Sequence, residues 1–110
     1  MSGAFEKREK GFESKWAHDE ELRFKVYARR NKLLGVWVAG QIGLSGDAVN
    51  AYAKEVVAAD FEKPGDDDVF AKVRGDLDAK KVALSDHLLR KKMDELLDEA
   101  KNQIESESRK

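Results

Sequence analysis

The segment VNAYAKEVV, residues 49–57, decides the fold class. Its apolar side chains fall at positions i, i+3, i+4, i+7 and i+8, which is the spacing that places them on one face of an α-helix. Lys54 and Glu55 fall on the opposite face. The pattern predicts an amphipathic helix near residues 46–60.

The same helical spacing recurs in three other parts of the chain. It predicts a long helix over residues 20–42, a shorter helix over residues 67–81 and a last helix over residues 86–106. One proline and few alternating apolar runs leave little support for strands. Connections of about four to seven residues favour antiparallel neighbours. We therefore predict an all-α fold, a four-helix bundle of up-down-up-down order, over residues 19–110.

Polar residues at the predicted helix starts favour these boundaries. Their side-chain oxygens can accept hydrogen bonds from first-turn N–H groups that have no partner within the helix. The candidate caps are Asp19, Ser45, Asp66 and Ser85. The long helix also has a face of small residues, which are Gly35, Ala39 and Gly40. Because glycine costs a helix about 1 kcal/mol relative to alanine, we expect this face to allow a neighbouring helix to approach closely.

Composition restricts the number of domains and the classes of function. A chain of 110 residues corresponds to one domain. Although 39% of its residues are charged, Leu, Ile, Val and Phe together number 26, which is enough for a small core. A net charge of -1 gives no general attraction to nucleic acid or anionic membranes. The absence of cysteine excludes disulfides and thiolate chemistry, and without a long apolar stretch or a signal-peptide pattern we expect a cytoplasmic protein.

Residues 1–18 differ from the predicted bundle. Three aromatic residues recur there on one helical face, but charged residues separate them. Three aromatic side chains bury too little surface to offset the conformational entropy lost when the whole segment becomes ordered. We therefore expect a mobile segment that folds as a helix onto a partner. The expected partner contacts are Phe5, Arg8, Phe12, Lys15 and Trp16.

A cluster of cationic and aromatic residues lies on the long helix predicted over residues 20–42. Its members are Tyr27, Arg29, Arg30, Lys32 and Trp37. Cations of this kind can bind phosphate oxygens, and an aromatic ring can stack on a base. The alternative interpretation, a solvated basic face beside an aromatic core contact, is the more common arrangement in proteins.

No residue pattern indicates catalysis or a metal site. His18 and His87 lack the partner spacing of zinc or di-iron bundle sites. Ser85 and Asp86 precede His87 directly, which is a helix-start pattern and not the spatial arrangement of a hydrolytic triad. The glycines within residues 35–46 match neither a P-loop nor a dinucleotide fingerprint. We expect a protein that is not an enzyme and that binds no metal.

Four long segments resemble one protein family. They are FESKWAHDEE (12–21), FKVYARRNKLLG (24–35), GLSGDAVNAYAKEVV (43–57) and ADFEKPGDDDVFAKV (59–73). Through them the chain resembles the ATPase inhibitor zeta subunit of alphaproteobacterial F-type ATP synthases over nearly its whole length. The resemblance implies a four-helix bundle that binds the catalytic head of the enzyme, formed by its alpha, beta and gamma subunits, and blocks ATP hydrolysis.

The resemblance also implies an inhibitory role for the mobile N-terminal segment and binding of ADP or ATP as a regulatory ligand on the bundle. The assignment of this ligand to the cluster at residues 27–37 rests on the residue types alone. We expect a monomer when free, located at the inner membrane through the ATP synthase. The alternative is a small helical bundle that binds nucleic acid or another protein.

Overall fold

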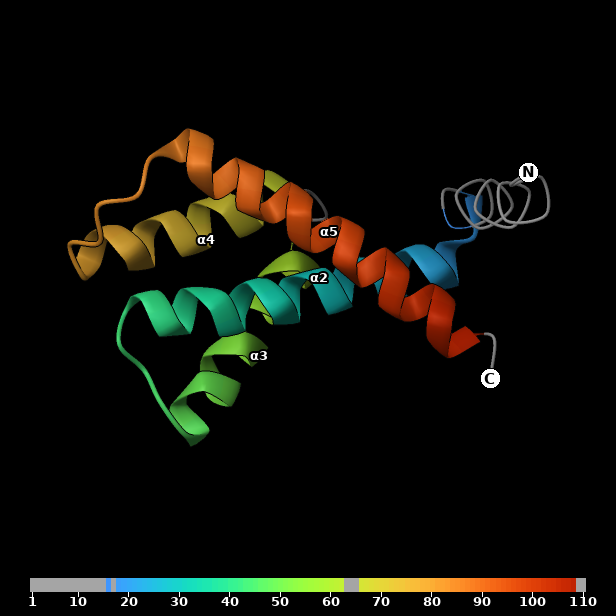
Figure 1. Ribbon diagram of the computed structural model, residues 1–110, viewed down its shortest axis with the longest axis horizontal. Helices are drawn as coiled ribbons and strands as arrows, with labels where there is room; N and C mark the ends of the chain where they lie inside the picture. The colour runs from blue at the N-terminus through green and yellow to red at the C-terminus, as the bar shows by residue number, and fades with distance from the viewer. Residues whose placement is uncertain (1–15, 17, 63–65, 109–110) are drawn as a thin grey trace, which may run out of the picture.

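The computed structural model describes residue 16, residues 18–62 and residues 66–108. This part of the chain forms four α-helices and no strand. The helices are α2 (Glu20–Gln41), α3 (Asp47–Glu62), α4 (Asp66–Ala79) and α5 (Asp86–Ser108). Figure 1 shows α2 and α4 running in one direction and α5 running back, while α3 crosses α2 obliquely. The predicted all-α four-helix bundle is confirmed.

Helices α2 and α5 both contribute to the two apolar clusters of the bundle. The main cluster takes residues from all four helices, including Leu34 of α2 and Val56 of α3, both fully buried. A second cluster joins α2 to the last turns of α5. It consists of the buried residues Val26, Ala100 and Ile104.

The predicted caps are confirmed at two helix starts. The carboxylate of Asp19 accepts a hydrogen bond of 3.1 Å from the backbone N–H of Leu22, at the start of α2. The hydroxyl of Ser85 accepts one of 3.1 Å from the backbone N–H of Leu88, at the start of α5. Each bond satisfies a first-turn donor that has no partner within its helix.

The predicted caps are wrong at the other two helix starts. Ser45 is not the capping residue of α3, because Gly46, with a φ of +61°, directly precedes the helix and its carbonyl accepts from the N–H of Val49. Asp66 is the first residue of α4 itself, and its carboxylate binds Arg30 of α2. At α3 the left-handed Gly46 takes the capping position, whereas at α4 a contact with another helix holds Asp66, which local capping patterns do not encode.

Candidate functional site

Arg30 of α2 is a buried cation inside the bundle. Arg30 is only 1% exposed. Its Nη2 donates to Oδ1 of Asp66 at 2.7 Å, and its Nε donates to Oδ1 of Asn31 at 2.8 Å. The guanidinium carbon lies 5.3 Å from the centroid of the Tyr27 ring. Because a buried charge is costly unless it is paired, this arrangement ties α2 to the start of α4.

Arg29, the neighbouring residue, points toward the end of α5. Its Nη1 donates to Oε1 of Gln103 and to Oε2 of Glu107, each at 2.7 Å, and its Nη2 donates to Oε1 of Glu107 at 3.0 Å. A forked arginine–carboxylate pair of this kind is stronger and more directional than a single contact. Arg29 therefore links α2 to the last turns of α5.

Lys32 and Trp37 lie apart from these two networks. Lys32 is exposed, whereas Trp37 is partly buried against the main cluster, with Nζ of Lys92 5.5 Å from its ring centroid. Of the five predicted nucleotide contacts, the structure brings Tyr27 and Arg30 together. Arg29 and Trp37 have other neighbours, and Lys32 is exposed. Their assignment to ADP or ATP stays a prediction.

Trp16 lies at the end of the bundle where α2 begins and α5 ends. Its ring centroid is 5.9 Å from that of Tyr27, at an interplanar angle of 52°, and Nζ of Lys101 is 5.1 Å from its centroid. The ring also packs against the second cluster. Trp16, an expected partner contact, thus contacts the bundle itself. The other expected contacts lie outside the described residues and are Phe5, Arg8, Phe12 and Lys15.

A polar network links α3 to α4. The Tyr52 hydroxyl donates to Oδ2 of Asp76 at 2.7 Å, and Nζ of Lys72 lies 2.9 Å from carboxylate oxygens of both Asp76 and Glu55. Burial, together with the hydrogen bond to Asp76, raises the pKa of Tyr52. Burial opposes the charge of Lys72, but its hydrogen bonds to Glu55 and Asp76 outweigh that effect and raise its pKa. Both shifts favour the protonated forms of Tyr52 and Lys72.

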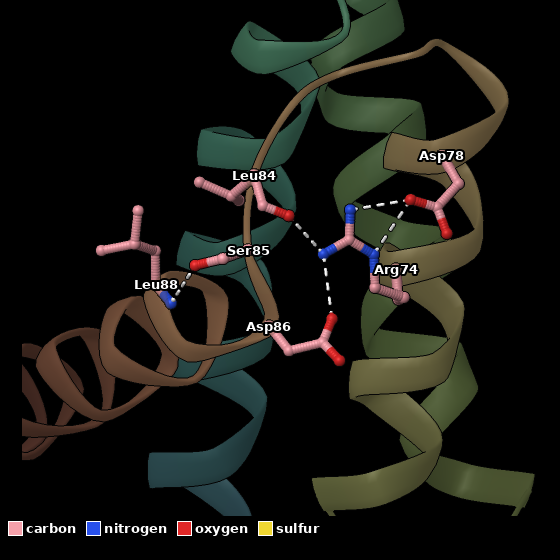
Figure 2. A network of polar contacts seen from close by, with 6 residues as sticks. All are labelled: Arg74, Asp78, Leu84, Ser85, Asp86 and Leu88. Carbon is pink, nitrogen blue, oxygen red and sulfur yellow. Dashed lines mark hydrogen bonds and ion pairs between the residues drawn. The ribbon is translucent and has the colours of Figure 1, made fainter.

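Arg74 of α4 binds the connection between α4 and α5 (Figure 2). Its Nη2 donates to Asp78 at 2.8 Å, and its Nη1 donates to the carbonyl of Leu84 at 2.6 Å and to Asp86 at 3.2 Å. The hydrogen bond to Asp78 is the main cause of a raised pKa of Arg74. These partners give Arg74 a structural role in fixing how the chain enters α5.

The described residues contain no group of three or more His, Cys, Asp or Glu side chains that could bind a metal ion. His18 is exposed at the start of the described chain. A search of the helices in that same part of the chain found none long and apolar enough to span a membrane.

The acidic partners of Arg29 and Arg30 are contacts that the sequence analysis did not identify. From the sequence, Asp66 is expected to cap a helix, and no pattern indicates a role for Glu107. One signal was available for Arg30, because Val26, Arg30 and Leu34 are spaced by four residues and therefore share one helix face. That spacing indicates burial of Arg30 without revealing its partner.

Comparisons with known proteins show a family to which the chain is similar. A family model described as ATPase inhibitor subunit zeta matches residues 1–103. A solved structure, described as a solution NMR structure, is 51% identical to this chain with a TM-score of 0.69, and the match covers 78% of this chain and 98% of that chain. No curated protein matches the sequence. The family match extends over the N-terminal residues as well as the bundle.

Proposed function

Because the chain belongs to the family of ATPase inhibitor zeta subunits, we propose that it binds the catalytic head of the F-type ATP synthase and inhibits ATP hydrolysis through residues 1–18. Family membership supports a regulatory, non-catalytic role at the ATP synthase. The observation that carries the proposal is the match over residues 1–103, which includes the N-terminal segment and nearly all of the bundle.

The packing of the bundle supports a separation between scaffold and inhibitory segment. The four helices bury their own apolar clusters, and the described N-terminal residue Trp16 covers the edge of the second cluster. We therefore propose that residues 1–15 are the part of the inhibitory segment that contacts the partner. Ordering such a segment on binding costs free energy, which keeps the inhibition reversible.

Removal of residues 1–15 tests this proposal and leaves Trp16 and the Asp19 cap in place. We expect the truncated protein to retain the helical circular dichroism of the bundle and to lose inhibition of ATP hydrolysis by the isolated catalytic head. The full chain, assayed in parallel, is the control. A truncated protein that inhibits as well as the full chain would transfer the activity to the bundle.

We also propose that ADP or ATP binds the bundle as a regulatory ligand. The family resemblance and the cationic cluster at residues 27–37 support this proposal. Both arginines already have carboxylate partners, so a phosphate group would have to replace Glu107 at Arg29 or Asp66 at Arg30. Arg29 is the more accessible, with a side chain 27% exposed against 1% for Arg30. The exchange of Glu107 for phosphate is therefore the arrangement that fits these residues best.

The Glu107→Gln variant tests the nucleotide proposal. Removing the competing negative charge should tighten binding of ADP at Arg29, measured by backbone amide shifts during an ADP titration. Shifts concentrated at residues 27–37 and in the last turns of α5 would support the site. Shifts elsewhere would reject it, and the absence of shifts at millimolar ADP in both proteins would remove the nucleotide proposal.

Nucleic-acid binding is the less favoured function. The net charge is -1, and the two arginines of the cluster have carboxylate partners within the chain. Phosphate contacts by free cations would make binding strongly dependent on salt. Salt-dependent binding of DNA or RNA, measured by fluorescence anisotropy, is the result that would favour this alternative.

A further inference from the structure

Trp16 covers an apolar cluster that is separate from the main core. In this second cluster Val26 and Ala100 are fully buried and Ile104 is 5% exposed. These residues come from the first turns of α2 and the last turns of α5. Figure 1 shows these turns at the end of the molecule opposite the α2–α3 and α4–α5 connections. The first described residue of the chain therefore packs where two distant helical segments meet.

The Trp16 ring makes two further contacts with the bundle. The tilted ring of Tyr27 is 5.9 Å away between centroids, and the ammonium of Lys101 lies 5.1 Å from the Trp16 centroid. Tilted aromatic pairs and cations over an indole ring are both attractive. The second cluster, Tyr27 and Lys101 together form a site for one indole side chain, which we call the Trp16 site.

We propose that the Trp16 site positions the inhibitory segment by fixing the C-terminal end of that segment beside the last turns of α5. This inference rests on the proposed function. Fixing one end of a segment before it binds reduces the entropy lost on association and raises its effective concentration near the partner. Trp16 is then a positioning residue, which acts through the bundle.

The interpretation of Trp16 as a direct partner contact gives a different expectation. If Trp16 inserts into the partner, weakening its site on the bundle leaves inhibition unchanged or improves it, because the ring no longer has to leave that site. If the site positions the segment, the same change weakens inhibition. Substitutions in the bundle, which leave residues 1–18 intact, therefore separate the two roles.

Two lysines of α5 provide a matched pair of substitutions. Lys101 lies over Trp16 and pairs with Asp98 at 3.4 Å, while Lys92 lies over Trp37 and pairs with Glu95 at 3.8 Å. Lys101→Glu places a negative charge against the Trp16 ring, which repels the electron-rich face. Lys92→Glu makes the same change of charge on the same helix, away from the Trp16 site.

The first measurement follows docking of the ring itself. In a Trp37→Phe background Trp16 is the remaining tryptophan, since the chain has two. We expect its fluorescence to be shielded from acrylamide in the parent protein and in the Lys92→Glu variant, and exposed in the Lys101→Glu variant. A Trp16 that is already as accessible as free tryptophan in the parent protein would overturn the proposal.

The second measurement is inhibition of ATP hydrolysis by the isolated catalytic head. We expect Lys101→Glu to raise the half-inhibitory concentration about tenfold and Lys92→Glu to change it by less than about twofold. Exposure of Trp16 without weaker inhibition would overturn the positioning role while leaving the inhibitor function intact. A full chain that does not inhibit would overturn the proposed function and this role with it, whatever the fluorescence shows.

Discussion

The Cα of Ala53 in α3 lies 2.6 Å from the position that a Cβ would occupy on Gly35 of α2. A side-chain atom of Val56 lies 3.3 Å from the same position. The two helices thus approach so closely that only glycine fits at this crossing. The predicted close approach is confirmed at Gly35 and wrong at Gly40, where a Cβ would meet nothing within 4 Å.

We expect Gly35→Ala to destabilise the bundle by about 1–3 kcal/mol, because the added methyl group forces α3 away from α2. Gly75→Ala in α4 is the matched control, since a Cβ there meets nothing within 4 Å. That variant should gain about 0.5–1 kcal/mol from helix propensity. Urea unfolding followed by circular dichroism measures both changes, and effects of the same sign would contradict the close approach.

The ion pair between Arg30 and Asp66 predicts a second difference in stability. Asp66→Ala removes the carboxylate that pairs with the guanidinium of Arg30, a residue that is only 1% exposed. This should lower the free energy of unfolding by about 1.5–3 kcal/mol. Asp67→Ala, one residue later in the same helical turn, removes a pair with Arg90, whose side chain is 45% exposed. That exposed pair should contribute about 0–1 kcal/mol.

The comparison of these two aspartates controls for their position, because both lie in the first turn of α4 and interact similarly with the helix dipole. Urea unfolding at neutral pH gives both free energies. Equal losses for the two variants would show that burial of Arg30 does not determine the strength of its pair.

Sequence periodicity predicted the helices well because each amphipathic face repeats within a few residues. The same information could not pair Arg30 with Asp66, which lies 36 residues further along the chain, since that contact depends on how α4 docks. Nor could it place Lys101 over Trp16. The candidate site residues could therefore be predicted from their residue types, whereas their partners depend on how the helices pack and could not be predicted from the sequence.

The chain adopts a left-handed backbone conformation just after α4, which the local sequence pattern did not predict. Lys81 has a φ of 57°, and the N–H of Val82 donates to the carbonyl of Leu77 at 2.9 Å. The equivalent position after α2 is Gly43, with a φ of 85°. Glycine is the usual residue at this position because a Cβ disfavours the left-handed conformation.

We therefore expect Lys81→Gly to stabilise the protein by about 0.5–1 kcal/mol and to raise its Tm by several degrees. Lys80→Gly is the control, because its φ is not positive and glycine only adds flexibility to the unfolded chain there. Thermal unfolding followed by circular dichroism distinguishes the two. A lower Tm for Lys81→Gly would mean that lysine adopts this conformation without cost.

The hydrogen bond from Tyr52 to Asp76 predicts how stability depends on pH. The pKa of Tyr52 is raised above the value of about 10 that it has in an unfolded chain. Above about pH 10 the folded state therefore retains a proton that the unfolded state has lost, and the free energy of unfolding falls as pH rises. Lys72, whose pKa is also raised, acts in the same direction.

We expect Tyr52→Phe to reduce this fall by about 1.4 kcal/mol per pH unit above about pH 10, because the variant has no phenol to titrate. Near neutral pH the variant should be about 1 kcal/mol less stable, since Asp76 loses one donor but keeps Lys72. Urea unfolding at several pH values between about 8 and about 11 gives both curves. Parallel curves would require the Tyr52 proton to leave at the same pH in the folded and unfolded states, which is incompatible with a buried phenol bonded to a carboxylate.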